Sequence, residues 1–175
     1  MSITEVDLEH LRRCVQLAAE ALSTHDDPFG SVLYYVKTYR SPGIATSRSA
    51  VQEDRNRIIS RNDATYHPEI KLALWAQANL TEDERAKSVL YTSGEHCPMC
   101  AAAHAWCGLG RIVYASSAAQ LAEWMKEMGM GGVSPVKALA IKDVAPYIEV
   151  DGPVEELAKD VKKLHFQKHR HVPKD

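Results

Sequence analysis

Two features are missing from this chain of 175 residues, and each absence removes a class of protein. No apolar run approaches the roughly 20 residues of a membrane-spanning helix, so we expect no membrane partner. There is no excess of positive charge, because 21 lysines and arginines face 23 aspartates and glutamates, a formal net charge of −2. The chain as a whole therefore lacks a basic footprint, and we expect no nucleic-acid partner.

Internal repeats, low-complexity stretches and a secretory signal segment are also absent from the sequence. Cysteine is scarce, with four in the chain. In a chain without a signal segment, four cysteines indicate a reducing compartment, and we expect a cytoplasmic protein with free thiols or metal ligands. The remaining composition, 45% hydrophobic and 25% charged, is that of a globular protein. We expect a single domain over residues 1–175.

Two of the four cysteines, Cys97 and Cys100, lie in the stretch SGEHCPMC and are separated by two residues. Pro98 lies between them and an alanine-rich run follows, which predicts that both thiols are at the first turn of a helix. A helix N-terminus favours the thiolate form. One further ligand would give three protein donors and an open position, the pattern of catalytic zinc sites. His67 is suited to be that ligand, and Glu69 to be the proton shuttle.

A structural zinc site would instead need four protein ligands, and His96 or Cys107 could supply the fourth. Cys107 follows Cys100 by about two helical turns, so we expect it in different surroundings, as a buried hydrophobe. Cys14 is interpreted as a core residue. For His96 the favoured interpretation is a loop residue, and a role beside the ligands or facing a substrate stays open.

The combination of His-x-Glu with a later Cys-x-x-Cys resembles the signature of zinc deaminases in the cytidine deaminase-like superfamily. The resemblance is strongest to the branch of guanine deaminases and tRNA adenosine deaminases. It extends to the Pro28-Phe29-Gly30 segment, to Asn56 and its spacing to the Asp63–Glu69 segment, and to the Gly110–Tyr114 segment. Departures from the family pattern include Pro68 in place of alanine and His96 in place of proline. None of them removes a ligand or the glutamate.

The resemblance implies a three-layer α/β/α fold with a central five-stranded mixed sheet. It implies one Zn²⁺ per chain, held by His67, Cys97 and Cys100, with Glu69 as the catalytic acid and base. It also implies a homodimer.

Four residues are expected at the substrate by the same resemblance: Asn56, Phe29, Pro68 and His96. Asn56 would donate a hydrogen bond to a ring carbonyl. Its alternative interpretation is a residue at a strand end that satisfies the backbone.

The implied reaction replaces an exocyclic amine of a nucleobase or nucleoside with a carbonyl and releases ammonia. The near-neutral charge favours a small substrate, and a guanine-like free base is the first expectation. The alternatives are a tRNA adenosine deaminase and a cytosine or cytidine deaminase. A hypothesis of another class is a non-catalytic scaffold stabilised by zinc, in which Glu69 is dispensable and the metal has no open position.

Apolar periodicity and turn signals predict alternating strands and helices. Strands are predicted at residues 31–36, 56–59, 89–92, 112–114 and 136–141. Helices are predicted from a capping box at residues 2–5 to residue 22, over residues 68–79, from residue 98, from a capping box at residues 117–120, and over residues 154–165. A capped turn is predicted at residues 81–84.

Two segments carry predictions of their own. The stretch at about 34–54 has no clean period from Ile44 to Val51, and we interpret it as an extended hairpin or a partly irregular loop. A basic helix is expected at about 154–170, with four cations near its end: Lys162, Lys163, Lys168 and Arg170. A solvated helix face is the favoured interpretation of these charges, and the alternative is an arm that contacts RNA.

Overall fold

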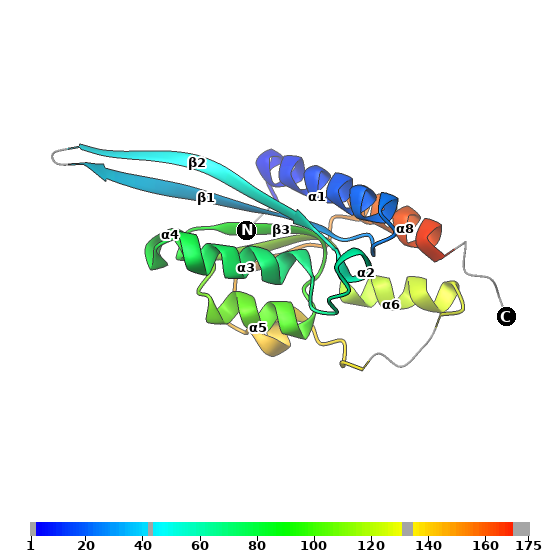
Figure 1. Ribbon diagram of the computed structural model, residues 1–175. Helices are drawn as coiled ribbons and strands as arrows, with labels where there is room; N and C mark the ends of the chain where they lie inside the picture. The colour runs from blue at the N-terminus through cyan, green and yellow to red at the C-terminus, as the bar shows by residue number, and fades with distance from the viewer. Residues whose placement is uncertain (1–2, 42–43, 131–134, 170–175) are drawn as a thin grey trace.

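A computed structural model describes residues 3–41, 44–130 and 135–169 (Figure 1). Five strands form one sheet in the order β2-β1-β3-β4-β5: β1 (Gly30–Ser41), β2 (Ile44–Arg55), β3 (Val89–Gly94), β4 (Arg111–Ser116) and β5 (Val150–Asp151). β1 is antiparallel to β2 and to β3, whereas β3, β4 and β5 are parallel. The predicted five-stranded mixed sheet is therefore confirmed.

Helices cover both faces of the sheet and complete three layers. One face carries α1 (Glu5–Ser23), α6 (Ala118–Glu127) and α8 (Glu155–His169). The other carries α3 (Pro68–Asn79), α5 (Pro98–Trp106) and α7 (Ile141–Val144). Two short helices, α2 (Ile58–Arg61) and α4 (Glu82–Ala86), precede and follow α3. Among the described residues, no helix is long and apolar enough to cross a bilayer.

The inner strands are apolar on both faces because both faces are covered. Val32 and Tyr91 pack in the core cluster shared with α1, α6 and α8. Their chain neighbours Leu33 and Leu90 pack in the opposite cluster, with α3. Successive side chains of a strand point to opposite faces, so this alternation places residues 31, 33, 90 and 92 on the α3 face.

Side-chain caps fix where three of the helices begin. Thr81 and Ser117 form the predicted capping boxes of α4 and α6. The capping box of α1 lies two residues later than the predicted one at residues 2–5. Thr4 is the N-cap, its hydroxyl accepts from the backbone of Asp7, and the Asp7 carboxylate accepts from the backbone of Thr4. Ser2 lies outside the described residues.

The strand predicted at residues 56–59 is wrong, and a helical turn, α2, begins at Ile58 in its second half. Asn56 Oδ1 accepts from the backbone N–H of Ile58 at 3.0 Å. Asp26 Oδ1 accepts from the N–H groups of Ile59 and Ser60, both at 2.9 Å. These side-chain acceptors offer the backbone an alternative to a strand ladder, and one of them comes from 33 residues earlier in the chain.

The strand predicted at residues 136–141 is also wrong. Ile141 begins α7, and its N–H donates to Glu95 Oε1 at 3.1 Å. The fifth strand is instead the two-residue β5, whose Val150 pairs with Ile112 of β4. β5 has two residues and is therefore too short to show the alternating hydrophobic pattern that predicts a strand.

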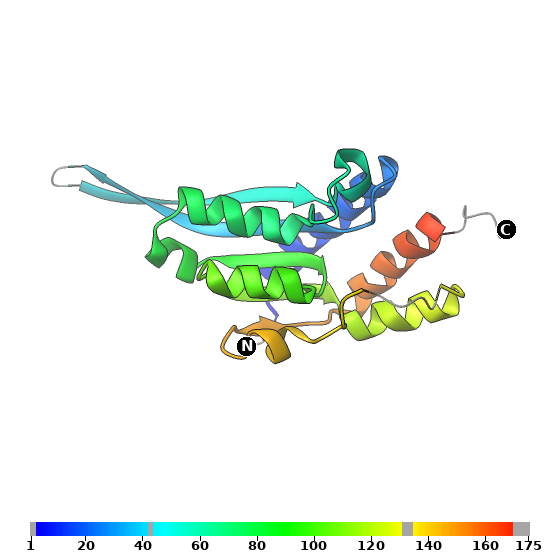
Figure 2. The ribbon, with the colours of Figure 1, turned by 60° about the horizontal axis from the view of Figure 1, so that its bottom comes forward.

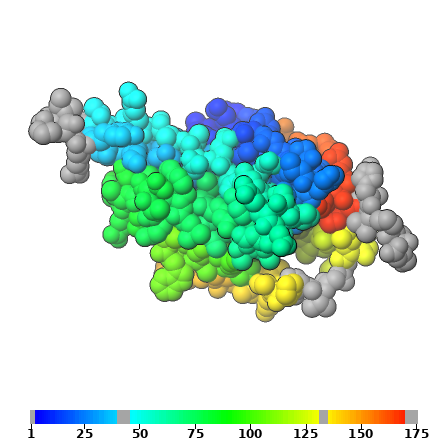
Figure 3. Space-filling model, viewed as in Figure 1, coloured from blue at the N-terminus to red at the C-terminus, as the bar shows by residue number. Residues whose placement is uncertain are grey.

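The stretch that has no clean period, Ile44–Val51, belongs to β2. β2 pairs with β1 along its full length, from Gly30 opposite Arg55 to Ser41 opposite Ile44. Pairing of β1 with β3 ends at Tyr34 and Val89, so the outer part of the hairpin has no partner strand beyond itself. The hairpin projects from the rest of the molecule in every view (Figure 1, Figure 2, Figure 3).

Candidate active site

Two helices, α3 and α5, begin beside the end of β3 and present side chains to one another. His67 is the N-cap of α3 and Cys97 is the N-cap of α5. In both helices the first position is proline, Pro68 and Pro98. Proline suits this position because the N–H that it lacks would have no intrahelical partner. The sequence therefore starts both helices directly after a donor side chain.

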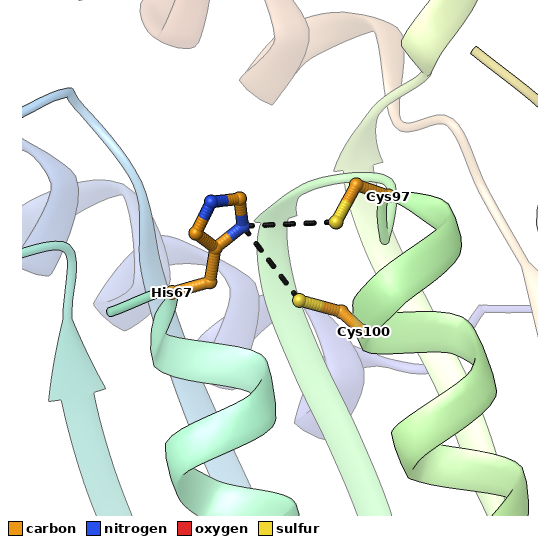
Figure 4. Close-up of side chains that lie close together, drawn as sticks. All are labelled: His67, Cys97 and Cys100. Atoms are coloured by element: carbon orange, nitrogen blue, oxygen red, sulfur yellow. Dashed lines mark hydrogen bonds between the residues drawn. The ribbon is translucent and has the colours of Figure 1, made fainter. Parts of the chain in front are cut away.

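The three predicted ligands meet at this point (Figure 4). His67 Nδ1 lies 3.7 Å from Cys97 Sγ and 3.7 Å from Cys100 Sγ. All three donor atoms lie within 4.8 Å of one another. Tetrahedral zinc, with Zn–S of about 2.3 Å and Zn–N of about 2.0–2.1 Å, separates S and N donors by roughly 3.6 Å. The donor set thus fits zinc in both chemistry and spacing.

The two thiols differ in acidity. The pKa of Cys97 is lowered to about 4, first by its hydrogen bond with Cys100 and also by its hydrogen bond with His67. The pKa of Cys100 is raised, first by the same hydrogen bond and then by burial. The pair therefore holds one proton at neutral pH, and a cation bound by both sulfurs would displace it.

Glu69 lies in the first turn of α3, beside the donors, and is 5% exposed. Its Oε2 is 3.7 Å from Cys100 Sγ. Its Oε1 accepts a hydrogen bond from Thr92 Oγ1 at 3.1 Å. Burial raises the pKa of Glu69 above its ordinary value. A buried carboxyl with a raised pKa, next to a metal site, can both take up and return a proton near neutral pH.

Asn56 lies next to this cluster and is buried. The neighbouring Arg57 N–H donates to the backbone carbonyl of Tyr66 at 3.3 Å, which places this loop beside His67. Asn56 N–H donates to the carbonyl of Phe29 at 2.9 Å. Its Oδ1 is used by the start of α2, while its Nδ2 makes no hydrogen bond with the described residues. The amide can therefore satisfy the backbone with its oxygen and still offer its N–H₂ group to a ligand.

Phe29 and Pro68, both predicted at the substrate, are held by packing. The Phe29 ring makes an edge contact with His165, with ring centroids 5.1 Å apart. A Cβ atom at Gly94 would be 3.0 Å from the Phe29 ring, so the absence of a side chain at Gly94 leaves room for the ring. Pro68 is buried in the first turn of α3.

His96 is fully buried and lies outside the three-residue donor cluster. Its ring makes an edge contact with that of His104 at 5.5 Å, and neither of its nitrogens has a hydrogen-bond partner among the described residues. Burial lowers the pKa of His96, so the ring is neutral. His104 Nε2–H donates to the carbonyl oxygen of Gly110, 2.8 Å away. Both rings are buried, and His104 belongs to α5 itself.

Two residues at the site were not predicted from the sequence, Thr92 and Ser31. They are register partners on β3 and β1, and both are fully buried. Nothing in the local sequence separates a strand hydroxyl that contacts a buried carboxylate from one that only pairs with its neighbour. The register between β1 and β3 is the missing information.

Comparisons with known proteins find deaminases. Residues 6–168 match the family model of MafB19-like deaminases. A guanine deaminase of Bacillus subtilis is 29% identical over 147 residues, covering 83% of this chain and 78% of the relative. A probable cytosine deaminase of Schizosaccharomyces pombe is 26% identical over 155 residues, covering 88% of each chain.

Solved structures show the same fold. The structure of NE0047 in complex with 2,6-diaminopurine has a TM-score of 0.66 at 21% identity, covering 95% of this chain and 82% of that one. A guanine deaminase from Nitrosomonas europaea has a TM-score of 0.60 at 21% identity, covering 91% and 82%.

Proposed function

Because the chain belongs to the MafB19-like deaminase family, we propose that it is a zinc-dependent deaminase of a guanine-like free base. Its broader activity, hydrolytic deamination of a nucleobase, is that of the family and of its named relatives. The proposal depends above all on one observation. The three donors of His67, Cys97 and Cys100 lie together with the carboxyl of Glu69 beside them.

His67, Cys97 and Cys100 would hold the metal and leave one position free of protein ligands. Zinc bound there would lower the pKa of a water ligand toward neutrality. The helix N-termini of α3 and α5 place the ligands on rigid elements.

Glu69 moves the protons. It takes one proton from the attacking water and delivers it to the ring nitrogen beside the amine-bearing carbon. The oxygen of water becomes the new carbonyl oxygen. The second proton of the water passes to the exocyclic amine, which leaves as ammonia. Burial and the raised pKa of Glu69 suit a group that must be base and then acid. Such a carboxyl typically contributes about two to four orders of magnitude in rate.

One observation favours guanine over the other bases, and a second favours a base that has a ring carbonyl. The Bacillus subtilis relative, a guanine deaminase, is 29% identical to this chain. We propose in addition that the N–H₂ group of Asn56 donates to a ring carbonyl, which guanine has and adenine lacks. We further propose that Phe29 and Pro68 form part of the wall of the base site. His96 would act there through packing, since its ring is fully buried.

Cytosine is the second candidate, supported by the likeness to the fission yeast probable cytosine deaminase. It also presents a ring carbonyl to Asn56, so the donor does not separate the two. Adenosine in tRNA is less favoured. The net charge is −2, and Lys162 and Lys168 of the basic helix already pair with Glu127 and Asp27.

The test is ammonia release by the purified zinc protein with guanine, cytosine, adenosine and tRNA as separate substrates. We expect turnover of guanine to exceed that of the others. Turnover of cytosine alone would replace the substrate. No ammonia from any of them, with zinc bound, would favour the scaffold hypothesis, for which a variant lacking Glu69 should be as stable as the parent.

We also propose that the protein is a cytoplasmic homodimer, and the layer of α3 and α5 is the proposed contact. Both helices are rich in apolar residues, yet Leu74 is 52% exposed and Trp106 is 90% exposed. A two-fold contact would bring this face against its own copy. Light scattering of the parent and of the double variant Leu74→Glu, Trp106→Glu tests it, with a monomer expected only for the variant. A monomeric parent would exclude the dimer.

A further inference from the structure

Two buried hydroxyls lie behind Glu69. Ser31 of β1 and Thr92 of β3 are direct partners in the antiparallel register, and both are 0% exposed. Leu33 and Leu90, each two residues away, pack on the α3 face of the sheet. Ser31 and Thr92 must then point to the same face, where Glu69 lies.

The hydroxyls and the carboxylate form a directed chain. Ser31 Oγ donates to Thr92 Oγ1 at 3.0 Å, and Thr92 Oγ1 donates to Glu69 Oε1 at 3.1 Å. A hydroxyl has one proton and two acceptor lone pairs. Because Thr92 accepts from Ser31, its own proton is directed at Glu69. These two hydrogen bonds together fix the direction in which the Thr92 hydroxyl points.

This chain distinguishes the two oxygens of Glu69. Oε1 is held by Thr92, while Oε2 lies 3.7 Å from Cys100 Sγ, on the side of the metal donors. The terminal torsion of a glutamate is otherwise broad and roughly two-fold. A hydrogen bond to one oxygen therefore fixes the rotation of the carboxyl and reserves the other oxygen for the reacting groups.

We propose that Thr92 is a positioning residue that orients Glu69, and that Ser31 sets the direction of the Thr92 hydroxyl. The expected effect on turnover rests on the proposed deaminase function. The orientation of the carboxyl does not, and it can be measured separately.

The competing interpretation is purely structural. Cross-strand pairs of serine and threonine stabilise many sheets without any catalytic neighbour. In that case removal of either hydroxyl would lower stability and leave the rate constant of the folded protein unchanged. Removal of an orienting group instead lowers kcat, because the carboxyl is misplaced in the transition state.

Four variants separate the two interpretations. Thr92→Val keeps the shape of the side chain and removes the hydroxyl, and Thr92→Ser restores it. Ser31→Ala removes the donor to Thr92. Ser116→Ala is the matched control, because Ser116 is also buried at this end of the sheet but its Oγ donates to the carbonyl of Ser93 and not to Glu69.

With guanine as substrate, Thr92→Val should lower kcat by about 10- to 100-fold, the range expected for a lost hydrogen bond to a charged group. KM should change by less than about threefold, since ground-state binding is not removed. Thr92→Ser and Ser116→Ala should stay within about threefold of the parent, and Ser31→Ala should lie between these and Thr92→Val. Zinc content should be equal in all of them. A full kcat in Thr92→Val, or a loss that Thr92→Ser does not rescue, would overturn the proposal.

The second measurement needs no substrate. Crystal structures of the zinc-loaded parent and of Thr92→Val should show the Glu69 carboxyl in one orientation in the parent and rotated, or in two orientations, in the variant. An unchanged carboxyl in Thr92→Val contradicts the positioning role whatever the substrate is. If the parent releases no ammonia from guanine, the proposed substrate fails, and the crystallographic comparison still decides the role of Thr92.

Discussion

Glu69 Oε2 lies 3.7 Å from Cys100 Sγ, so the proposed proton shuttle contacts a proposed metal ligand. Glu69 is nevertheless outside the donor cluster, which contains His67, Cys97 and Cys100. The contact places one carboxyl oxygen beside the metal donors while Thr92 holds the other. Metal binding and proton transfer are thus assigned to different residues at the starts of α3 and α5, and they can be tested separately.

The first prediction separates them at Glu69. Glu69→Gln keeps the size of the side chain and removes its ability to accept a proton. We expect about one zinc per chain and a loss of turnover of at least about a hundredfold. Metal analysis and ammonia release on the same sample measure both. Glu82→Gln, on the exposed α4, is the control and should be fully active. Full activity of Glu69→Gln would exclude the assigned role.

The second prediction concerns the cysteines. Cys97→Ser or Cys100→Ser should lower both the zinc content and the Tm, because a metal that binds only the folded chain stabilises it. Cys107→Ser, one residue beyond the end of α5, should retain about one zinc per chain. Metal analysis and thermal unfolding with and without a chelator provide the measurement. If the chelator leaves the parent's Tm unchanged, zinc does not contribute to its stability.

The third prediction concerns acid stability. Burial lowers the pKa of His165 and of His104 to about 4 in the folded protein. The unfolded value is about 6.5, so between about pH 6.5 and pH 4 the unfolded chain binds more protons. The free energy of unfolding is therefore unaffected by these histidines above about pH 6.5, where they are neutral in both states. It decreases as the pH falls toward 4, because the unfolded chain takes up protons that the folded protein does not.

Replacing one of these histidines should reduce that dependence. His165→Phe keeps the ring contacts with Phe29 and Trp124 and removes a titrating group. We expect the fall in the free energy of unfolding between pH 6.5 and pH 4 to shrink by up to about 3 kcal/mol. Urea unfolding at several pH values measures it. Phe166→Leu, next to His165 in α8, removes no titrating group and should leave the pH dependence unchanged.

The fourth prediction distinguishes a free base from RNA. The quadruple variant Lys162→Gln, Lys163→Gln, Lys168→Gln, Arg170→Gln should leave guanine turnover within about threefold and weakly dependent on salt. Three of these cations pair within the chain, with Glu127, Asp160 and Asp27, and Arg170 lies outside the described residues. Turnover measured from low to moderate salt is the test.

Its control is the variant Lys87→Gln, Lys126→Gln, Lys137→Gln, which changes exposed charges elsewhere. tRNA deamination that weakens by orders of magnitude with salt, and that is lost only in the quadruple variant, would make the basic helix a nucleic-acid surface.

The sequence by itself pointed to the candidate donors. Pro98 indicated that Cys97 and Cys100 lie at a helix start, while His67 and Glu69 were assigned through the resemblance to the zinc deaminase signature. The structure brings these four side chains together. The strands β3 and β4 could also be found from the sequence, because runs of β-branched and aromatic residues are a local signal. Cys14 could also be placed in the core from its position next to an apolar stripe, and it is fully buried.

Only the tertiary structure decided what depends on partners distant in sequence. The α2 turn replaced a predicted strand because Asp26 supplies acceptors for its backbone. The irregular stretch of β2 became a strand because β1 pairs with it residue by residue. Thr92 reached Glu69, and Ser31 reached Thr92, through the register of β1 with β3. Local patterns specify which groups are present at a helix start, but strand register and distant hydrogen bonds decide which way they point.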